Sequence, residues 1–154
     1  MKIKIVCFNK ISKEFKDAYN MYLEKLSKHS KIDVIQIQEV DFGDIKSNRV
    51  RNEQNILEKL NILNGFEIFL LDINARQYSS EDIVSILKRN QNYNSAKLCF
   101  IIGPSDGFSS EFRIKWQNKL SFGPLTLPYN LVRIILLEQL YRGFKISKNQ
   151  KYHK

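Results

Sequence analysis

The stretch Lys97-Leu-Cys-Phe-Ile-Ile102, followed at once by Gly103-Pro-Ser-Asp-Gly107, decides the fold. Its first six residues are nearly all apolar, which is typical of a strand covered on both faces. The five that follow are residues that end a strand and begin a turn. A strand of this kind predicts a parallel sheet with helices packed against both sides.

Similar segments recur along the chain, and each apolar strand-like run is followed by a segment with helical periodicity. The other expected strands are Lys2–Phe8, Lys31–Val40, Phe66–Asp72 and Leu120–Phe122. The expected helices are Glu14–His29, Glu53–Leu63, one capped by Ser79 or Ser80, one from Ser109 or Ser110 to about Asn118, and Asn130–Ile146. Residues 41–52 are polar and are expected to form a loop. Alternating strands and helices predict one α/β domain over residues 1–154, with a mostly parallel sheet and flanking helices.

Composition bounds the functional classes. The 25 Lys and Arg residues outnumber the 16 Asp and Glu residues, for a net charge of +9. A basic surface favours polyanions such as nucleic acid, but an AT-rich coding composition explains a lysine-rich solvated surface equally well. No apolar run is long enough for a membrane span or a signal peptide, so we expect a cytoplasmic protein without membrane contact. Cys7 and Cys99 both lie in apolar runs, where buried reduced thiols are expected, although a disulfide between them remains open.

Three expected strand ends carry loops suited to a small molecule. Ligands of open parallel sheets bind outside the carboxyl ends of the strands. The loops here are 71–74, 103–107 and 123–127. Glycine at positions 103 and 107 permits positive φ and a close approach of the backbone to a ligand. The dinucleotide and P-loop fingerprints are both absent, so these loops indicate a site for an adenine ring and a ribose rather than for a phosphate chain.

Other catalytic sets are missing from the chain. Only two histidines occur, His29 and His153, and the two cysteines do not have zinc spacing, so no metal site is expected. His29 follows a surface helix and is expected to be solvated. His153 lies in the C-terminal tail beside Tyr152.

The helix that begins after Pro128 is apolar around nearly its whole circumference. Such a helix needs cover on every side, so the sheet and a second copy of the chain are expected to share it. Two arginines interrupt this apolar surface. We expect Arg133 to be structural, while RNA phosphate and a structural ion pair with Glu138 are equally favoured for Arg142.

Several of these positions, in order and spacing, match a known family: Leu71-Asp72, Gly103-x-x-x-Gly107, Leu120-Ser-Phe122, Thr126-x-Pro128, Arg133, Glu138-Gln139, Tyr141-Arg142 and Tyr152-His153. They resemble the ribosomal RNA large subunit methyltransferase H family, of the SPOUT class. The resemblance runs the whole length and is densest after residue 97. It implies a homodimer that transfers a methyl group from S-adenosylmethionine to N3 of a pseudouridine in 23S rRNA on the assembled ribosome. It also implies a C-terminal trefoil knot, an exception to the usual unknotted topology.

The resemblance also assigns residues to roles. The cofactor would contact Leu71, Gly103, Phe122, Gly123, Pro124, Leu125, Thr126 and Leu127, and the catalytic side would comprise Arg142, Tyr152 and His153. Arg142 would anchor a phosphate or the developing anion, and Tyr152 or His153 would help the N3 proton to leave.

This chain departs from the family's habit at four positions. Members often have glycine where Pro104 stands, glycine near Ala75, histidine at Tyr129 and alanine at Gly143. None of these changes removes the whole site, so the resemblance implies an active enzyme. The main alternative is a non-catalytic RNA-binding or ribosome-binding module that retains the fold, and calorimetry with S-adenosylmethionine separates the two.

Overall fold

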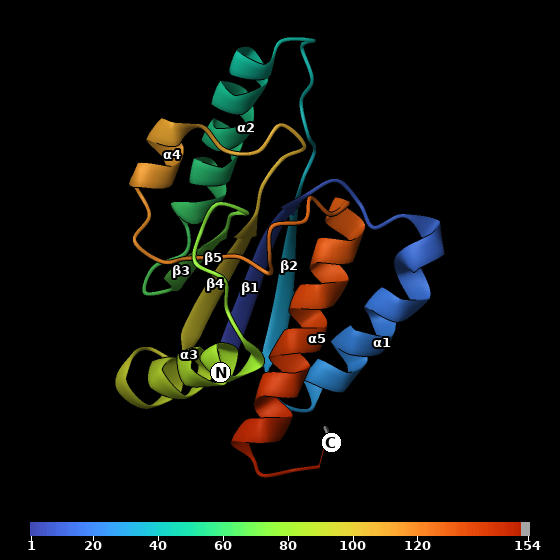
Figure 1. Ribbon diagram of the computed structural model, residues 1–154, viewed down its shortest axis with the longest axis vertical. Coiled ribbons are helices and arrows are strands. Elements are labelled where there is room, and N and C mark those ends of the chain that lie inside the picture. The colour runs from blue at the N-terminus through green and yellow to red at the C-terminus, as the bar shows by residue number, and fades with distance from the viewer. Residues whose placement is uncertain (152–154) are drawn as a thin grey trace.

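Five parallel strands form one sheet, in the order β2-β1-β4-β3-β5, in the computed structural model, which describes residues 1–151 (Figure 1). The strands are β1 (Lys2–Phe8), β2 (Lys31–Ile37), β3 (Glu67–Leu71), β4 (Lys97–Ile102) and β5 (Lys119–Leu120). The predicted α/β class and parallel sheet are confirmed. Strand β4 occupies the centre, and five of its six residues are buried, which agrees with its unbroken apolar sequence.

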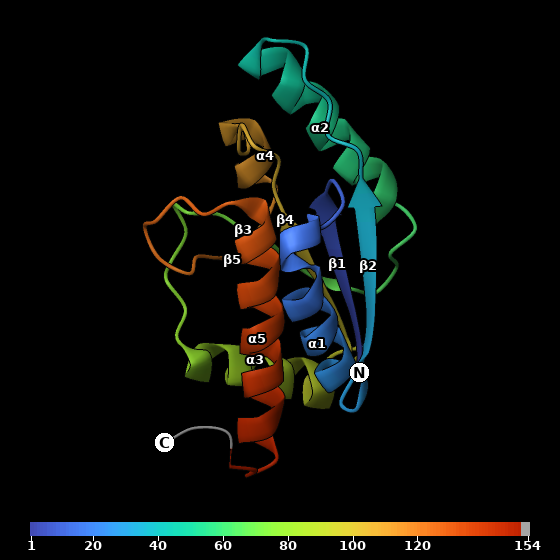
Figure 2. The same cartoon turned by 90° about the vertical axis from the view of Figure 1, so that its right-hand side faces the viewer.

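Helices cover both faces of this sheet. Helices α1 (Lys16–Ser27), α3 (Ser80–Tyr93) and α5 (Tyr129–Ser147) pack on one face, and α2 (Ile45–Leu60) and α4 (Ser110–Ile114) pack on the other. A short 3-10 turn, η1 (Lys13–Phe15), precedes α1. Helices α1 and α5 lie side by side along the sheet in both ribbon views (Figure 2). Within residues 1–151, no helix is both long and apolar enough to cross a membrane.

The expected loop at residues 41–52 is wrong, because α2 begins at Ile45. Asp44 caps this helix, and its carboxylate accepts a hydrogen bond from the Ser47 amide at 2.8 Å. The side chains of Asn48 and Asn52 turn inward and bond the backbone of the preceding segment, at Phe42 N, Val40 N and Val40 O. Both asparagines are buried. Residues that look like a loop by polarity are therefore the polar inner face of a helix.

The other helices follow the prediction, apart from their ends. Ser79, one of the two expected caps, caps α3, and the structure adds a reciprocal capping box with Asp82. Helix α4 ends at Ile114 rather than near Asn118. At the crossing of α3 and α5, a Cβ on Gly143 would lie 2.7 Å from Leu87 Cδ1. Glycine at this position, where the family often has alanine, therefore admits the Leu87 side chain.

Strand β5 is shorter than expected and lies between two segments that are distant in the sequence. Leu120 O accepts from the Asp72 amide of the β3 end at 2.9 Å, while Ser121 bonds Arg76 O and Tyr78 N on its other side. Figure 1 shows the loop of residues 72–79 beside the segment after β5. The trefoil knot stays a prediction.

Both cysteines are buried and free, so the reduced state is confirmed and a Cys7–Cys99 disulfide is absent. Burial raises the pKa of the Cys7 thiol to about 11 and that of the Cys99 thiol to about 12. Nearby cations lower both values, but by less than burial raises them.

Candidate functional site

A cavity of about 540 Å³ lies at the carboxyl ends of β3, β4 and β5, beside the first turn of α5. This volume lies within the roughly 300–1,000 Å³ that is common for small-molecule sites. Most of the predicted cofactor residues line it together: Leu71, Gly103, Phe122, Gly123, Leu125, Thr126 and Leu127. Pro124 is exposed and lies outside the wall. The three strand-end loops thus converge, while their contact with a cofactor stays a prediction.

Gly103 is required by packing rather than by its backbone conformation. A Cβ at this position would lie 2.8 Å from the Cε2 and Cζ atoms of Phe108. The Phe108 ring is buried and stacks on Phe112, with 5.2 Å between the ring centroids. The expectation of positive φ holds at Gly107, where φ is +70°, but not at Gly103.

Helix α2 holds the loop of residues 103–107 from behind. Arg49 donates two hydrogen bonds to Asp106 O, at 3.0 Å from Nε and 2.7 Å from Nη2. Asn48 Nδ2 donates to the Asp106 carboxylate at 2.8 Å. Pro104 opens the turn, and its carbonyl accepts from the Gly107 amide at 2.9 Å. The proline departure therefore fits a tight turn, and Arg49 braces the cavity wall.

Two carboxylates accept hydrogen bonds from the loop of residues 103–107 and from Ser109, the cap of α4 that follows it. Glu39 accepts from the Ser105 amide at 2.6 Å and from the Ser105 hydroxyl at 3.0 Å. Glu53 accepts in the same way from the amide and hydroxyl of Ser109, at 2.6 and 2.9 Å. These bonds fix the loop before any ligand enters, which is the preorganisation that a binding site needs.

An ion pair in the cavity wall was not predicted. Arg113 Nε lies 3.2 Å from Asp72 Oδ2, without the alignment of a hydrogen bond. The Asp72 carboxylate is nearly buried and also accepts from the Asn74 amide at 3.1 Å. Its position directly after an apolar strand is a usable sequence signal. Arg113 gives no such signal, because its partner is distant in the chain.

A serine turn shapes the wall after β5. The Ser121 hydroxyl accepts from the Gly123 amide at 3.0 Å and lies 2.9 Å from Gly123 O. Gly123 has φ of +132°, which favours glycine. Leu125, beyond this turn, is 75% exposed at the cavity mouth, and Ile73 on the neighbouring loop is 43% exposed. The mouth therefore presents apolar side chains to whatever approaches it.

Of the predicted catalytic residues, the structure places only Arg142, and Arg142 does not line this cavity within one chain. Arg142 lies on α5 ten residues beyond Val132, the last helical residue in the cavity wall, or about 15 Å along the axis. Arg142 Nε pairs with Glu138 Oε1 at 3.2 Å, so the structural ion pair is confirmed. Tyr152 and His153 lie outside the described residues.

His29 was expected to be solvated, but its side chain is half-buried against α5. Its ring stacks on Phe144 at 5.6 Å between centroids and meets the edge of Tyr141 at 5.7 Å. Lys148 Nζ lies 3.1 Å from Nδ1. Burial first, and then the positive charges of Lys148 and Lys145, lower the pKa of His29 below its ordinary value. This histidine belongs to the packing between α1 and α5.

Arg133 is structural, as expected, but it pairs with carbonyl groups rather than with a carboxylate. Its side chain is almost completely buried and donates from Nη2 to Phe8 O and, at 2.8 Å, to Asn9 O. Its guanidinium also lies over the ring of Tyr129, 5.1 Å from the centroid. Arg133 therefore ties the end of β1 to the first turns of α5, next to the cavity.

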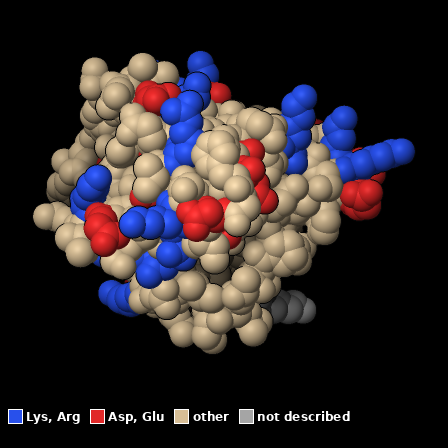
Figure 3. Space-filling view, turned by 90° about the horizontal axis from the view of Figure 1, so that it is seen from above, with Lys and Arg blue, Asp and Glu red and all other residues tan. Residues whose placement is uncertain are grey.

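Charges around this edge of the sheet are mixed. Figure 3 views the molecule from above, and Lys and Arg side chains there lie among Asp and Glu side chains. This face has no uninterrupted basic block.

Comparisons with known proteins identify a family and a similar fold. A family model described as "Predicted SPOUT methyltransferase" matches residues 1–153. The chain is 46% identical to ribosomal RNA large subunit methyltransferase H of Mycoplasma mycoides subsp. mycoides, with 100% of both chains covered. The proteins of the same name from Mesoplasma florum and Enterococcus faecalis are 44% and 32% identical, again over 100% of both chains. A solved structure of a probable methylase family protein from Haemophilus influenzae has a TM-score of 0.58 at 12% identity, covering 99% of this chain and 70% of that one, which is a likeness of fold.

Proposed function

The chain belongs to the SPOUT methyltransferase family, and we propose that it methylates N3 of a pseudouridine in 23S rRNA with S-adenosylmethionine as donor. The observation that carries this proposal is the cavity where three strand-end loops meet, in a chain matched over its whole length by large-subunit rRNA methyltransferases. The proposal places the protein in the cytoplasm with its substrate.

The cavity suits this cofactor chemically. Leu71, Phe122 and Leu127 supply apolar walls for an adenine ring, and the Thr126 hydroxyl and the Asp72–Arg113 pair supply polar groups for the ribose and the amino acid part. Seven of the eight residues assigned to the cofactor line this one space. When bound, S-adenosylmethionine supplies a methyl group that its sulfonium already activates.

The protein's main contribution is then alignment. The loop of residues 103–107 is fixed by Arg49 and Glu39, so the wall holds its shape without reorganising during the reaction. The N3 proton of the base has to leave, and we assign its removal to His153 or Tyr152 in the tail. Arg142 would bind a phosphate or the developing anion.

We propose a homodimer because apolar side chains of α5 stay only half-buried in one subunit, and because Arg142 lies away from the cavity of its own subunit. All 19 residues of α5 are buried or half-buried, and Leu131 and Ile135 lie half-buried on the same stripe as the Glu138–Arg142 pair. In a twofold interface each helix meets its own copy. An antiparallel pairing would place Arg142 of one subunit beside the first turns of the partner α5, which border the partner's cavity. The tail that follows Arg142 would reach the same place.

Mass mapping of 23S rRNA tests the function directly. Cells that lack this protein should lose a single methyl group at a pseudouridine, and purified protein with S-adenosylmethionine should restore it. An unchanged modification map would contradict the proposed reaction. If calorimetry detected no binding at millimolar S-adenosylmethionine, the chain would instead be an RNA-binding module that retains the fold.

The two histidines provide a matched pair for the proposed proton transfer. His153→Gln should lower the methylation rate strongly and alter its pH dependence, while His29→Gln should leave the rate near wild type. Equal rates for the two variants would remove His153 from the mechanism.

Mixed subunits test whether sites are shared. Arg142→Ala and Gly123→Val, each inactive alone, should regain activity when mixed, because one hybrid site keeps both groups intact. If the mixture stayed inactive although light scattering showed dimers, each site would be complete within one subunit.

Substrate choice follows from the mixed charges around the cavity. The surroundings of the cavity offer few contacts to phosphates close to the reacting base, so placing that base would depend on the shape of a large folded target. We therefore propose the assembled ribosome as the substrate. Equal rates on ribosomes and on protein-free 23S rRNA would contradict this.

A further inference from the structure

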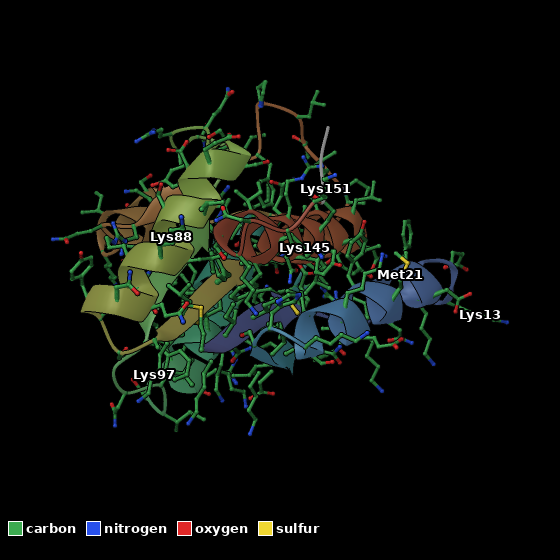
Figure 4. All side chains as sticks on the ribbon, turned by 90° about the horizontal axis from the view of Figure 1, so that it is seen from below. Lys13, Met21, Lys88, Lys97, Lys145 and Lys151 are labelled. Carbon is green, nitrogen blue, oxygen red and sulfur yellow. The ribbon has the colours of Figure 1, made fainter. Side chains whose placement is uncertain are left out.

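A second groove, of about 350 Å³, lies at the amino edge of the sheet, opposite the cavity. We call it the amino-edge groove. Its chemistry comes from six side chains: Lys2, Lys4, Lys31, Lys97, Phe66 and Asp33. Figure 4 views the molecule from below, toward this end, and labels Lys97.

Strand register places three of these lysines in one row. Lys2 of β1 pairs directly with Lys31 of β2 on one side and with Lys97 of β4 on the other. Neighbouring strands lie about 4.8 Å apart, so the three Cα atoms span roughly 10 Å. Like charges directly opposite one another destabilise a sheet, so the row is not explained by folding.

The row lies on the face of the sheet that α2 covers only in part. Side chains alternate along a strand, so Lys2 shares its face with Lys4 and with Val6, which packs in the core on the α2 side. Helix α2 ends at Leu60, before it reaches this end of the sheet, and the segment 62–64 that follows forms a wall of the groove. The start of the sheet is therefore left open, and Lys2 and Lys31 are exposed there.

The groove is only partly neutralised. Asp33 is the one carboxylate among the described residues that line it, and it pairs with Lys4 at 2.8 Å. Phe66 lies beneath two ammonium groups, with its centroid 5.8 Å from Lys97 Nζ and 6.0 Å from Lys4 Nζ. Proteins that bind single-stranded nucleic acid commonly combine an aromatic ring, on which a base stacks, with positive charges that contact the phosphates.

We propose that the amino-edge groove binds consecutive phosphates of an RNA backbone. The inference rests on the proposed function in that it takes the RNA to be the substrate. A straight row of ammonium groups across three strands suits a chain of phosphates better than one compact anion. Strand β1 has seven residues, so the groove and the cavity lie roughly 20 Å or more apart. The groove therefore anchors RNA at a distance from the reacting base and has no part in chemistry.

Salt dependence of RNA binding tests the proposal on the full-length protein. The probe is a fluorescein-labelled single-stranded RNA of mixed sequence, followed by anisotropy over a series of KCl concentrations. Each single-strand phosphate contact contributes about 0.7 to the slope of log K against log salt, so Lys2→Gln/Lys31→Gln/Lys97→Gln should reduce the slope by about 2. The matched control, Lys13→Gln/Lys16→Gln/Lys88→Gln, changes three exposed lysines elsewhere and should keep the wild-type slope.

Two further variants test whether positive charge in the row determines RNA binding. Replacing the three row lysines by arginine should preserve the slope. Asp33→Asn removes the carboxylate and frees Lys4, so it should tighten RNA binding and steepen the slope by up to about 0.7. Circular dichroism should show the glutamine triple variant melting no lower than wild type, since its substitutions relieve repulsion.

The outcomes separate cleanly. Equal slopes for the two glutamine triple variants would overturn the groove and leave net charge as the cause of binding. The proposal would also be overturned if tripolyphosphate bound the row at micromolar concentration while the glutamine triple variant bound RNA like wild type. That result would identify a small-anion site. Wild-type protein that bound RNA through the row but methylated no rRNA would overturn the proposed function and leave the groove intact.

Discussion

Gly103→Ala provides the sharpest test of the cavity wall. The new Cβ would lie 2.8 Å from two ring atoms of Phe108 and 3.3 Å from a third, whereas carbon atoms pack at about 3.5–4.0 Å. Phe108 is 3% exposed and stacks on Phe112, which is 1% exposed, so the ring has little room to retreat. The ring must shift, and the open side is the cavity that it lines.

The magnitude follows from overpacking. Forcing extra volume into a packed core costs about 1–3 kcal/mol. For a chain of this length each kcal/mol lowers Tm by roughly 2–4 °C, so we expect a fall of roughly 2–12 °C. A ring displaced into the cavity should also weaken S-adenosylmethionine binding, which calorimetry measures as a higher Kd.

A double-mutant cycle isolates the cause. Phe108→Leu alone should destabilise through lost packing, but in that background Gly103→Ala should cost about 1–2 kcal/mol less, because the smaller side chain makes room. If the losses in unfolding free energy were additive, contact with Phe108 would not be the reason for glycine at position 103. A Gly103→Ala protein with wild-type Tm and wild-type Kd would refute the packing argument altogether.

Three further predictions concern the rest of the molecule. Burial raises the pKa of Cys7 to about 11 and of Cys99 to about 12. A thiol reagent at pH 8 should therefore label neither cysteine in the native protein and both in denaturant. Rapid labelling of the native protein would contradict their burial. Burial and nearby lysines lower the pKa of His29 below its ordinary 6.5. The unfolded state therefore binds the proton more readily than the folded state. The free energy of unfolding should fall as the pH drops below about 6.5. Chemical denaturation from pH 7.5 to 5 should show a flatter profile for His29→Gln, and parallel profiles would count against the stacked, half-buried ring. Ser79→Ala should cost about 1 kcal/mol by removing the α3 cap, measured by urea unfolding, while Ser85→Ala on the same helix should be nearly neutral.

Local patterns in the sequence predict most of the fold. Strand β4 and strand β1 were located to the residue, because a run of apolar residues bounded by polar ones marks a buried strand without further context. The α3 cap is predictable to within one residue, Ser79 or Ser80, because a capping serine lies next to the helix that it caps. Helix α2 was missed at its start because Asn48 and Asn52 owe their burial to bonds with a segment that has no pattern of its own.

Part of the candidate site could likewise be predicted from local sequence, and part could not. Its three loops were predictable, because glycine, proline and serine directly after apolar strands mark the edge where ligands bind. The Asp72–Arg113 pair and the bracing of Asp106 by Arg49 were not, because each joins residues that only the folded chain brings together. The actual reason for Gly103 also needed the Phe108 ring in place.

The lysine row shows why register carries functional information that composition hides. A single lysine at the start of a strand is common, and each of three strands starts with one: Lys2, Lys31 and Lys97. The net charge of +9 fits a solvated surface as well as an RNA-binding one. Only the pairing of β1 with both neighbours turns them into adjacent charges. Adjacent like charges repel most at low ionic strength, where phosphate contacts are also strongest. The same residues should therefore lower stability in dilute buffer and raise RNA affinity there, and a ligand that occupies the row should reverse the first effect. We therefore expect RNA to raise the Tm of the wild-type protein and to leave the Tm of the glutamine triple variant unchanged.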